Sequence, residues 1–382
     1  MTGVVELSEA ELDELRSAVR AFLEAKSPED AVRKAMEGDP RYDPQVWAQM
    51  ADQLRLPGLA IPEEYGGDGF GQVALGAVLE EMGRALLCSP FFATVVLAAQ
   101  ALLASGDRDA CARHLPGIAA GTTTAALAVA ERTGAWDPVQ ITARAVRRTG
   151  DAAGWELTGT KSFVIDGTSA DLLLVVARTK AGPSLFTVDR RAADHVAPGL
   201  TSEPMETLDA TRTMARVRLE STPATLVGTD GAGGRLMARI LDLAAVGLAA
   251  EQAGGAARCL ESSTAYAGTR VQFGRLIGSF QAVKHKCADM LVQVELARAS
   301  AREAARLADI GDEGFAVASA AAHVCCSRAY LFAATENIQV HGGIGFTWEH
   351  PAHLYFRRAK SSQLMLGGPS AYHERLLERL GI

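Results

Sequence analysis

Residues 336 to 360, ENIQVHGGIGFTWEHPAHLYFRRAK, contain three closely spaced glycines, Gly342, Gly343 and Gly345, followed by rings and cations. Glycine allows left-handed turns, and it lets a backbone approach another group where a side chain would block it. A helix that simply ends with a capping glycine needs only one such residue. The stretch therefore predicts a glycine-rich turn that follows a helix, with more glycines than a helix end requires.

Hydrophobic periodicity around this stretch divides the chain into three predicted domains. Helical spacing begins at Ser8, which forms the pattern of a capping box with Glu11. Short runs rich in β-formers follow, and long helical patterns then return. We expect an α+β fold with an N-terminal helical domain (1–121), a small β domain (122–228) and a C-terminal helical bundle (229–382).

Composition limits the classes of protein that the chain can be. Its 382 residues are 48% hydrophobic, which suffices for a sizeable core. Charges of both signs are mixed, with a formal net charge of -7, so the chain lacks the basic field that nucleic-acid binding needs. The acidic start lacks the regions of a secretion signal, and no apolar run approaches the ~20 residues of a membrane span. We expect a cytoplasmic protein that binds neither nucleic acid nor membrane.

Cysteine and histidine positions predict no metal site. His285 and Cys287 are two residues apart on a predicted helix, so their side chains point in different directions. His341, His350 and His353 flank the glycine turn without acidic or cysteine partners. The spacings of the cysteines match no zinc or thioredoxin-like motif, and reduced thiols are expected at all six positions, Cys88, Cys111, Cys259, Cys287, Cys325 and Cys326.

Two motifs taken together identify a family. TRVQFGRLIGSFQAVKHKCADM (269 to 290) precedes QVHGGIGFTWEH (339 to 350), with IPEEYGGDG in the first predicted domain and GTKSFVIDG and ADLLLVVAR in the second. In this order and on this layout, the chain resembles the acyl-CoA dehydrogenase superfamily over nearly its whole length. The resemblance implies that superfamily's fold, with a β-barrel-like middle domain and a C-terminal four-helix bundle.

The resemblance implies a flavoprotein that removes two hydrogens from an acyl-CoA thioester. In the family a carboxylate takes a proton from the α carbon, and a hydride passes from the β carbon to N5 of FAD. Each FAD is shared, because one subunit's β domain holds the isoalloxazine ring and the other subunit's bundle holds the pyrophosphate and adenosine. Arg270 matches the arginine that meets the pyrophosphate, a task for a forked cation. The residues that match this lent half-site are Arg270, Gln272, Phe273, Gln281, Gln339, Gly342 and Gly343.

The half-site that the chain would provide for its own flavin departs from the family pattern. AERTGAWD (130 to 137) keeps only Glu131 and Asp137 of the family's Thr-Glu-Pro and Gly-Ser-Asp segment. Residues 163 to 165 read Phe-Val-Ile where the family has Trp-Ile-Thr, so a ring is kept and the hydroxyl near N5 is lost. Trp136 replaces a small serine, and we expect its indole to fill the space where backbone and phosphate would meet.

The family's catalytic base is missing from both of its positions. The C-terminal Glu-Gly-Thr motif aligns with Leu366, and the alternative position near the start of a long helix aligns with Ala244. Without a positioned carboxylate, proton abstraction loses on the order of 10²-fold to 10⁴-fold in rate. Three other carboxylates do not match either family position, and none is an obvious substitute for the base: Asp242, Glu251 and Glu349. We therefore expect no catalytic residue in this chain.

These departures resemble the heteromeric acyl-CoA dehydrogenases of actinobacteria, in which one subunit lacks the base and a complete FAD site of its own. Members of that group act on CoA thioesters from steroid side chains and rings, among others. The expectation is an α2β2 heterotetramer with a related subunit that carries the glutamate. The alternatives are a self-sufficient, homo-oligomeric dehydrogenase with a relocated base, another flavin oxidoreductase such as an oxidase or monooxygenase, and a non-catalytic scaffold that binds acyl-CoA or a protein partner.

Overall fold

The chain divides into two compact units. The computed structural model describes residues 4–148, 154–192 and 195–382. The first unit contains residues 1–5, 35–70 and 88–244, and the second contains residues 6–34, 71–87 and 245–382. The helical segment before residue 121 thus contributes to both units, and the three boundaries drawn from hydrophobic period stay a prediction.

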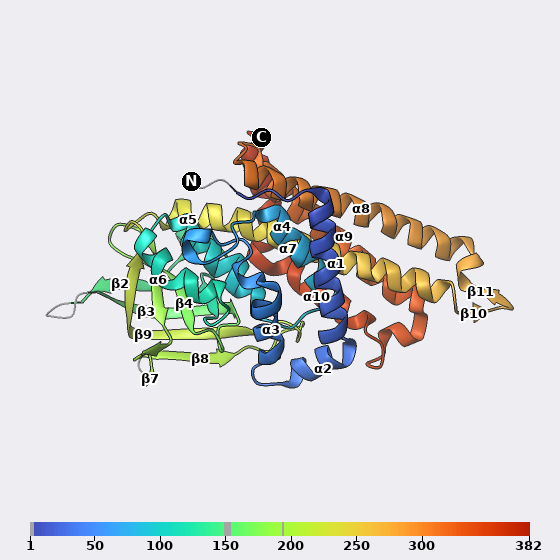
Figure 1. Cartoon of the computed structure of the whole chain (residues 1–382), viewed down its shortest axis with the longest axis horizontal. Helices are drawn as coiled ribbons and strands as arrows, with labels where there is room; N and C mark the ends of the chain where they lie inside the picture. Colours follow the sequence, from blue (N-terminus) through green and yellow to red (C-terminus); the bar gives the residue numbers. More distant parts are fainter. Residues whose placement is uncertain (1–3, 149–153, 193–194) are drawn as a thin grey trace. The chain divides into compact units, whose positions relative to one another are not determined.

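Helices predominate among the described residues up to residue 121, as the pattern predicts (Figure 1). The predicted capping box is present, because Oγ of Ser8 accepts from the N–H of Glu11 and the Glu11 carboxylate accepts from the N–H of Ser8. Backbone hydrogen bonds between residues five apart, in place of four apart, mark one segment as a π-helix. The helices are α1 (Glu9–Lys26), α2 (Glu29–Glu37), α3 (Pro44–Leu54), α4 (Gln72–Arg84), the π-helix (Phe92–Ala99), α5 (Gln100–Ser105) and α6 (Arg108–Ala119).

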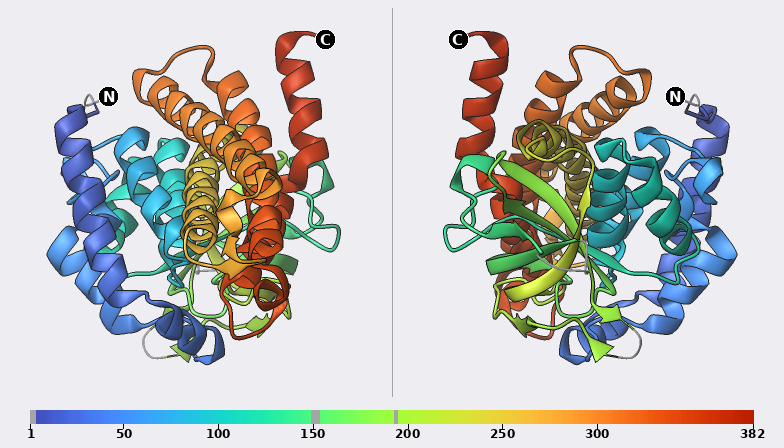
Figure 2. Two further views of the ribbon diagram at one scale, coloured as in Figure 1. Left: turned by 90° about the vertical axis from the view of Figure 1, so that its right-hand side faces the viewer. Right: turned by 90° about the vertical axis from the view of Figure 1, so that its left-hand side faces the viewer.

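The middle of the chain forms a β-barrel, in front in the right-hand view of Figure 2. Its strands are β1 (Ala125–Ala128), β2 (Arg144–Arg147), β3 (Trp155–Ile165), β4 (Leu172–Arg178), β5 (Pro183–Asp189), β8 (Leu200–Pro204) and β9 (Met214–Val227), and β6 (Arg191–Ala192) and β7 (His195–Val196) pair separately. The ring closes because β4 pairs with β2 on one side and antiparallel with β5 on the other. Six apolar residues of β4 are buried in succession, as expected for a strand covered on both faces.

The remainder forms the predicted helical bundle. Its elements are α7 (Gly233–Ala267), β10 (Val271–Gln272), β11 (Arg275–Leu276), α8 (Gln281–Ile310), α9 (Phe315–His341), a 3-10 turn (Gly342–Phe346), α10 (Ala352–Leu364) and α11 (Gly368–Leu380). Alanines line the buried faces of α8 and α9, so these helices pack closely side by side. Glycines bring α4 close to α7, because a Cβ at Gly83 would lie 2.0 Å from the carbonyl oxygen of Glu251.

One helical segment, Phe315–Phe346, is long and apolar enough to cross a bilayer by length and composition. This departs from the prediction that no apolar run approaches that length. Half of its apolar window is buried inside the structure, where α8, α10 and α11 pack against α9. The central position of α9 in the bundle accounts for its composition.

Candidate functional site

Arg270 lies between the end of α7 and the hairpin formed by β10 and β11. Its backbone is fixed on both sides, because its N–H donates to the carbonyl of Tyr266 (2.9 Å) and its own carbonyl accepts from Ile277 (2.9 Å). The side chain is exposed. The predicted guanidinium therefore stands on the surface of the second unit, at the base of a rigid hairpin.

The hairpin turn directs Phe273 outward. Phe273 and Gly274 both have positive φ, 52° and 75°, as a two-residue type I′ turn requires. That conformation costs a phenylalanine about 1–2 kcal/mol, yet the ring is 90% exposed. The guanidinium of Arg275 lies 4.0 Å from the ring centroid of Phe280, which meets the Phe273 ring edge to face at 6.1 Å. A strained residue that the chain does not bury is typical of a contact surface.

The remaining predicted side chains of the lent half-site are also exposed. Gln272 lies in β10 opposite Arg275, and Gln281 is the first residue of α8. Gln339 lies in the last turn of α9. All three carboxamides thus face outward from the second unit rather than into its core.

Two of the three glycines of the turn present open backbone. Gly342 ends α9 with a φ of 65°, and a Cβ at Gly342 or Gly343 would meet no atom within 4 Å. Gly345 differs, because a Cβ there would lie 2.9 Å from the carbonyl oxygen of Ile338 and 3.0 Å from Cβ of His341. Close packing inside the chain explains Gly345, whereas open space over Gly342 and Gly343 leaves room for another molecule.

The structure brings the hairpin and the glycine turn into one region. Tyr266, whose carbonyl anchors Arg270, stacks its ring on that of His341, with centroids 4.4 Å apart. His341 is the last residue of α9 and directly precedes Gly342. That Arg270 and Gln339 contact the same ligand stays a prediction.

Glu131, one of the two residues kept from the family's flavin segment, is bonded within the barrel. Its carboxylate accepts from the backbone N–H groups of Thr142 (3.0 Å) and Ala143 (2.9 Å) and from Nζ of Lys161 (2.8 Å). Burial lowers the pKa of Lys161 to about 8, although Glu131 favours its charged form. Burial also opposes the ionisation of Glu131, but Lys161 and the other donors outweigh it, so its pKa is lowered. Sequence reasoning missed Lys161, whose only signal was its place within GTKSFVIDG.

The other residues of the chain's own flavin half-site differ in their burial. Phe163 has a φ of 57° and keeps 38% of its surface exposed. Gly134 approaches this ring, since a Cβ there would lie 3.4 Å from it. Trp136 and Ile165 are buried, and Asp137 caps a short 3-10 helix by accepting from the N–H of Val139 (2.9 Å). The segment therefore serves local structure and offers no hydroxyl at residue 165.

Neither family position for the base holds a carboxylate. Leu366 is buried, with a left-handed φ of 59°, and the two residues after it, Gly367 and Gly368, also have positive φ. Ala244 is fully buried in α7. The backbone at Leu366 thus makes a strained turn that presents an apolar side chain.

The nearby carboxylates considered as substitutes are engaged elsewhere or exposed. Glu251 forms an ion pair with Arg358 at 2.9 Å, and both side chains are buried. Glu349 is exposed, and a hydrogen bond from Thr347 lowers its pKa. Asp242 is buried in α7. The ion pair of Glu251 argues against its use as a free proton acceptor.

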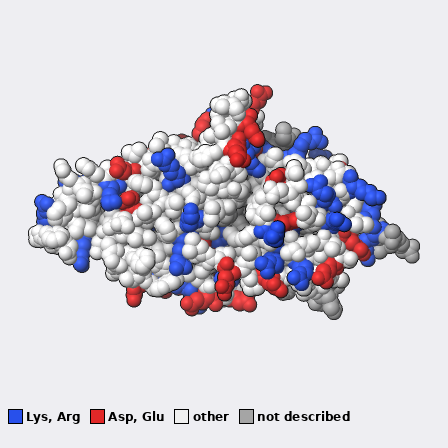
Figure 3. All heavy atoms as spheres, turned by 180° about the vertical axis from the view of Figure 1, so that it is seen from behind, with Lys and Arg blue, Asp and Glu red and all other residues white. Residues whose placement is uncertain are grey.

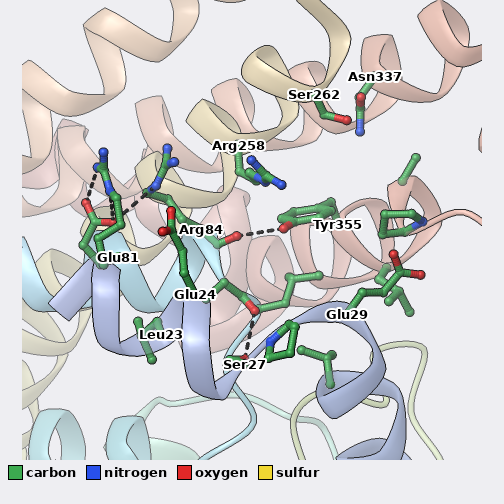
Figure 4. Close-up of a pocket in the computed structure, with 18 residues that line it drawn as sticks. Leu23, Glu24, Ser27, Glu29, Glu81, Arg84, Arg258, Ser262, Asn337 and Tyr355 are labelled. Atoms are coloured by element: carbon green, nitrogen blue, oxygen red, sulfur yellow. Dashed lines mark hydrogen bonds and ion pairs between the residues drawn. The ribbon is translucent and has the colours of Figure 1, made fainter. Parts of the chain in front are cut away.

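A cavity of about 350 Å³ lies within the second unit, between α1, α2, the end of α4, α7 and the start of α10 (Figure 4). Its polar wall is a chain of ion pairs in which Glu81 bonds to Arg20 (2.7 Å) and Arg84 (3.2 Å), and Arg84 bonds to Glu261 (2.6 Å). The hydroxyl of Tyr355 donates to the carbonyl of Arg84 (2.7 Å). These charged side chains form ion pairs with one another. None of the predicted flavin residues lines the cavity. Sequence reasoning missed it because six helices, including α9 through Asn337, supply its walls.

Charge and cysteine chemistry suggest no further site. On the face shown in Figure 3, positive and negative side chains are interspersed. Across residues 4–148, 154–192 and 195–382, no group of three or more His, Cys, Asp or Glu side chains is placed to hold a metal ion. The six cysteines are free thiols, as predicted, and four of them are buried.

Family models match almost the whole chain. They are the N-terminal domain of acyl-CoA dehydrogenase at residues 9–122, its middle domain at 126–222 and its C-terminal domain at 231–380. The chain belongs to the acyl-CoA dehydrogenase family and is an oxidoreductase of that family. Members of the family are FAD-dependent flavoproteins.

Individual relatives refine this placement. Acyl-CoA dehydrogenase IpdE2 of Mycobacterium tuberculosis is 37% identical over 362 residues, which cover 95% of each chain. A Tcur3481-Tcur3483 steroid acyl-CoA dehydrogenase variant has a TM-score of 0.86 at 33% identity, covering 97% of this chain and 98% of that one. The ChsE4-ChsE5 complex from Mycobacterium tuberculosis has a TM-score of 0.87 at 28% identity and 98% coverage of both chains. These two structures are heteromeric complexes, each named for a pair of proteins.

Proposed function

We propose that this chain is the base-free subunit of a heteromeric acyl-CoA dehydrogenase and lends half of an FAD site to its partner. The observation that carries this proposal is a contrast within one molecule. Arg270, Phe273, Gly342 and Gly343 are exposed, whereas Leu366 and Ala244 supply no carboxylate at the family's two positions for the base. A homodimer of this chain would repeat two incomplete sites, and a related partner completes one of them.

The lent half-site fits FAD by the chemistry of its donors. A pyrophosphate suits a permanently charged fork such as Arg270. Gln339 and Gln281 are exposed carboxamides that donate and accept hydrogen bonds. Open space over Gly342 and Gly343 admits a ligand against the backbone. By contrast, the barrel segment near Phe163 offers no hydroxyl at Ile165.

In this proposal the chain's residues bind and orient, and they move no proton. Bound FAD would accept the hydride that leaves the β carbon of the acyl thioester. Arg270 and the carboxamides would hold the cofactor's phosphate and adenosine portion across the subunit boundary. A glutamate of the partner would take the α proton, because Leu366 occupies the corresponding position here.

The relatives support a proposal for the substrate class. The Tcur3481-Tcur3483 structure is described as a steroid acyl-CoA dehydrogenase, and it is 33% identical to this chain over nearly all of its length. We infer a steroid-derived acyl-CoA thioester as substrate and a cytoplasmic location for the assembly. Exposed apolar side chains on α8, at Leu291, Val292 and Leu296, support a protein partner there.

Co-expression tests the proposal. Expressed alone, the chain should be poorly soluble or colourless, and inactive toward acyl-CoA thioesters. With the related subunit from the neighbouring reading frame, it should form a heterotetramer with about one FAD per heterodimer. Flavin absorbance and the mass of the purified species are the measurements. A stable homotetramer that carries one FAD per chain and reduces a dye with acyl-CoA would contradict it, and protein that stays colourless with the partner would favour a scaffold.

A further inference from the structure

Three aromatic rings form a continuous stack in the second unit, at the junction of the hairpin and the glycine turn. Tyr266 stacks on His341 with centroids 4.4 Å apart and an interplanar angle of 28°. His341 in turn faces His350, with centroids 4.3 Å apart and a tilt of 45°. We call these three residues the ring stack. They come from the end of α7, the end of α9 and the segment before α10.

Each member of the ring stack is bonded to a segment of the lent half-site or to its support. The carbonyl of Tyr266 accepts from the N–H of Arg270 (2.9 Å). His341 directly precedes Gly342, the first glycine of the turn. Nδ1 of His350 accepts from the N–H of Ala352 (3.2 Å), at the start of α10. The ring stack therefore connects the base of the Arg270 hairpin, the glycine turn and α10.

The hydrogen bonds of His341 are compatible with a neutral ring, and that of His350 requires an unprotonated Nδ1. Nδ1 of His341 faces the carbonyl of Asn337 at 2.8 Å, and a carbonyl only accepts, so Nδ1 carries the hydrogen. Nε2 of His341 is then free to accept from the hydroxyl of Ser262 at 3.5 Å. Nδ1 of His350 accepts a backbone N–H, which leaves its hydrogen on Nε2. A second proton on His350 would remove the acceptor for the N–H of Ala352, the first residue of α10.

Charged groups around the ring stack also bear on its protonation. From α2, Arg33 opposes a positive charge on His350 and Glu29 favours it. From α10, His353 opposes it as well. Burial is the largest effect, and it lowers the pKa of His341 and of His350 below the ordinary histidine value.

The third histidine of the region lies beside the stack. His353 packs edge to face on Trp348 at 4.6 Å, and Arg357 lies 4.7 Å from the centroid of that indole. Burial, Arg33 and Arg357 lower the pKa of His353. Arg33 of α2 and Arg357 of α10 thus oppose a positive charge on His353, and Glu29 favours one.

We infer that the neutral ring stack is a positioning device that holds the Arg270 hairpin and the glycine turn in the mutual placement that the lent flavin half-site needs. This inference rests on the proposed function and assigns residues that the family motifs leave without a role. Protonation would place positive charges on rings that are now in contact. It would also remove the hydrogen bond between His350 and the N–H of Ala352 at the start of α10. The loosened form would have the ordinary histidine pKa of about 6.5 and the stacked form a lower one, so the half-site should loosen as pH falls below about 6.5.

Flavin release from the assembled protein tests the inference without an activity measurement. The flavin-loaded complex with the related subunit is taken from about pH 8 to about pH 5, and freed FAD is followed by its fluorescence. The wild-type complex should release FAD progressively below about pH 6.5. His341→Phe keeps the ring and abolishes its titration, so its release should shift to lower pH. His341→Ala removes the stack and should weaken FAD binding on the order of tenfold even at about pH 8.

A histidine outside the region provides the matched control. His373 is exposed on α11, and His373→Gln should leave the release profile unchanged. Release profiles of His341→Phe and His341→Ala that coincide with the wild-type profile would overturn the inference. Arg270→Glu separates this outcome from failure of the proposed function. If Arg270→Glu loses FAD while both His341 variants behave as wild type, only the positioning role fails; if Arg270→Glu also retains FAD, the lent half-site itself is wrong.

Discussion

At the scale of single residues, Arg270 offers the most direct test of the lent half-site. Its side chain is exposed, while its backbone is held by Tyr266 and Ile277. Arg270→Glu reverses a charge where the pyrophosphate would lie, so the assembled protein should lose at least about tenfold in flavin content. Its free energy of unfolding should change by less than about 0.5 kcal/mol, as for other exposed positions.

The control for this substitution is Arg41→Glu, another exposed arginine in a different part of the chain. Flavin per protein is measured by absorbance after purification, and unfolding by denaturant titration. Normal assembly with unchanged flavin stoichiometry in Arg270→Glu would count against the assignment.

The buried pair of Lys161 and Glu131 makes a second prediction at this scale. Glu131→Gln would leave the ammonium of Lys161 fully buried without its counter-ion, and breaking such a pair costs about 3–5 kcal/mol. Because the folded-state pKa of Lys161 is already lowered to about 8, the folded chain binds fewer protons than the unfolded chain between that value and the ordinary one. The contribution of Lys161 to stability therefore rises with pH through that window.

Urea unfolding of Glu131→Gln at neutral pH measures the loss. Glu156→Gln is the matched control, since Glu156 pairs with Arg148 at 3.5 Å on the surface of the same barrel and such pairs contribute about 0–1 kcal/mol. Adding Lys161→Met to Glu131→Gln should recover part of the loss, because the uncompensated charge is then gone. Equal stability of Glu131→Gln and Glu156→Gln would refute this account.

At the scale of elements, glycines determine how closely α4 and α7 approach. A Cβ at Gly254 would lie 1.8 Å from the carbonyl oxygen of Glu80, so no side chain fits without separating the helices. Gly254→Ala should therefore lower the free energy of unfolding by about 1–3 kcal/mol or more. Gly234, in the first turn of the same helix, has no atom within 4 Å of a Cβ. Gly234→Ala should be neutral or stabilising by about 0.5–1 kcal/mol, because alanine favours helix.

Thermal and denaturant unfolding of Gly254→Ala and Gly234→Ala are compared. The comparison shows whether helix packing or helix propensity determines the effect of an added Cβ on stability. If α7 tolerates alanine equally at both positions, the helices are not held at the distance that the structure shows. The same close packing accounts for the alanine-rich faces of α8 and α9, which a hydrophobic period alone describes only as apolar.

At the scale of the whole molecule, the distribution of exposed apolar side chains favours an assembly. Phe273, Phe346 and Trp348 are exposed by 90%, 83% and 61%, and all three flank the predicted lent half-site. Exposed rings of this size mark surfaces that another molecule covers. This distribution agrees with the relatives that are named for a pair of proteins. Co-expression with the related subunit, followed by measurement of the mass and flavin absorbance of the purified species, tests directly whether an assembly forms.

Much of the fold and part of the site followed from local pattern. The capping box at Ser8, the change from helical to strand period and the return to long helices are set by neighbouring residues, so their positions are written in the chain itself. The absence of a base at Leu366 and Ala244 is likewise a property of residue type. The motifs matched Arg270 and the glycines to positions of the acyl-CoA dehydrogenase family. The matching domain models confirm that the chain belongs to that family.

Contacts between segments that are remote in the sequence could be known only from the tertiary structure. Glu131 lies 30 residues from Lys161, and only the closed barrel makes them partners. Glu251 is withdrawn from catalysis by Arg358, 107 residues away. The contact of Tyr266 with His341 joins the hairpin to the glycine turn because α7 and α9 end side by side. Sequence period reports which face of an element is buried, but the energy of a buried charge or a ring stack depends on which atoms meet there, and that is determined by packing.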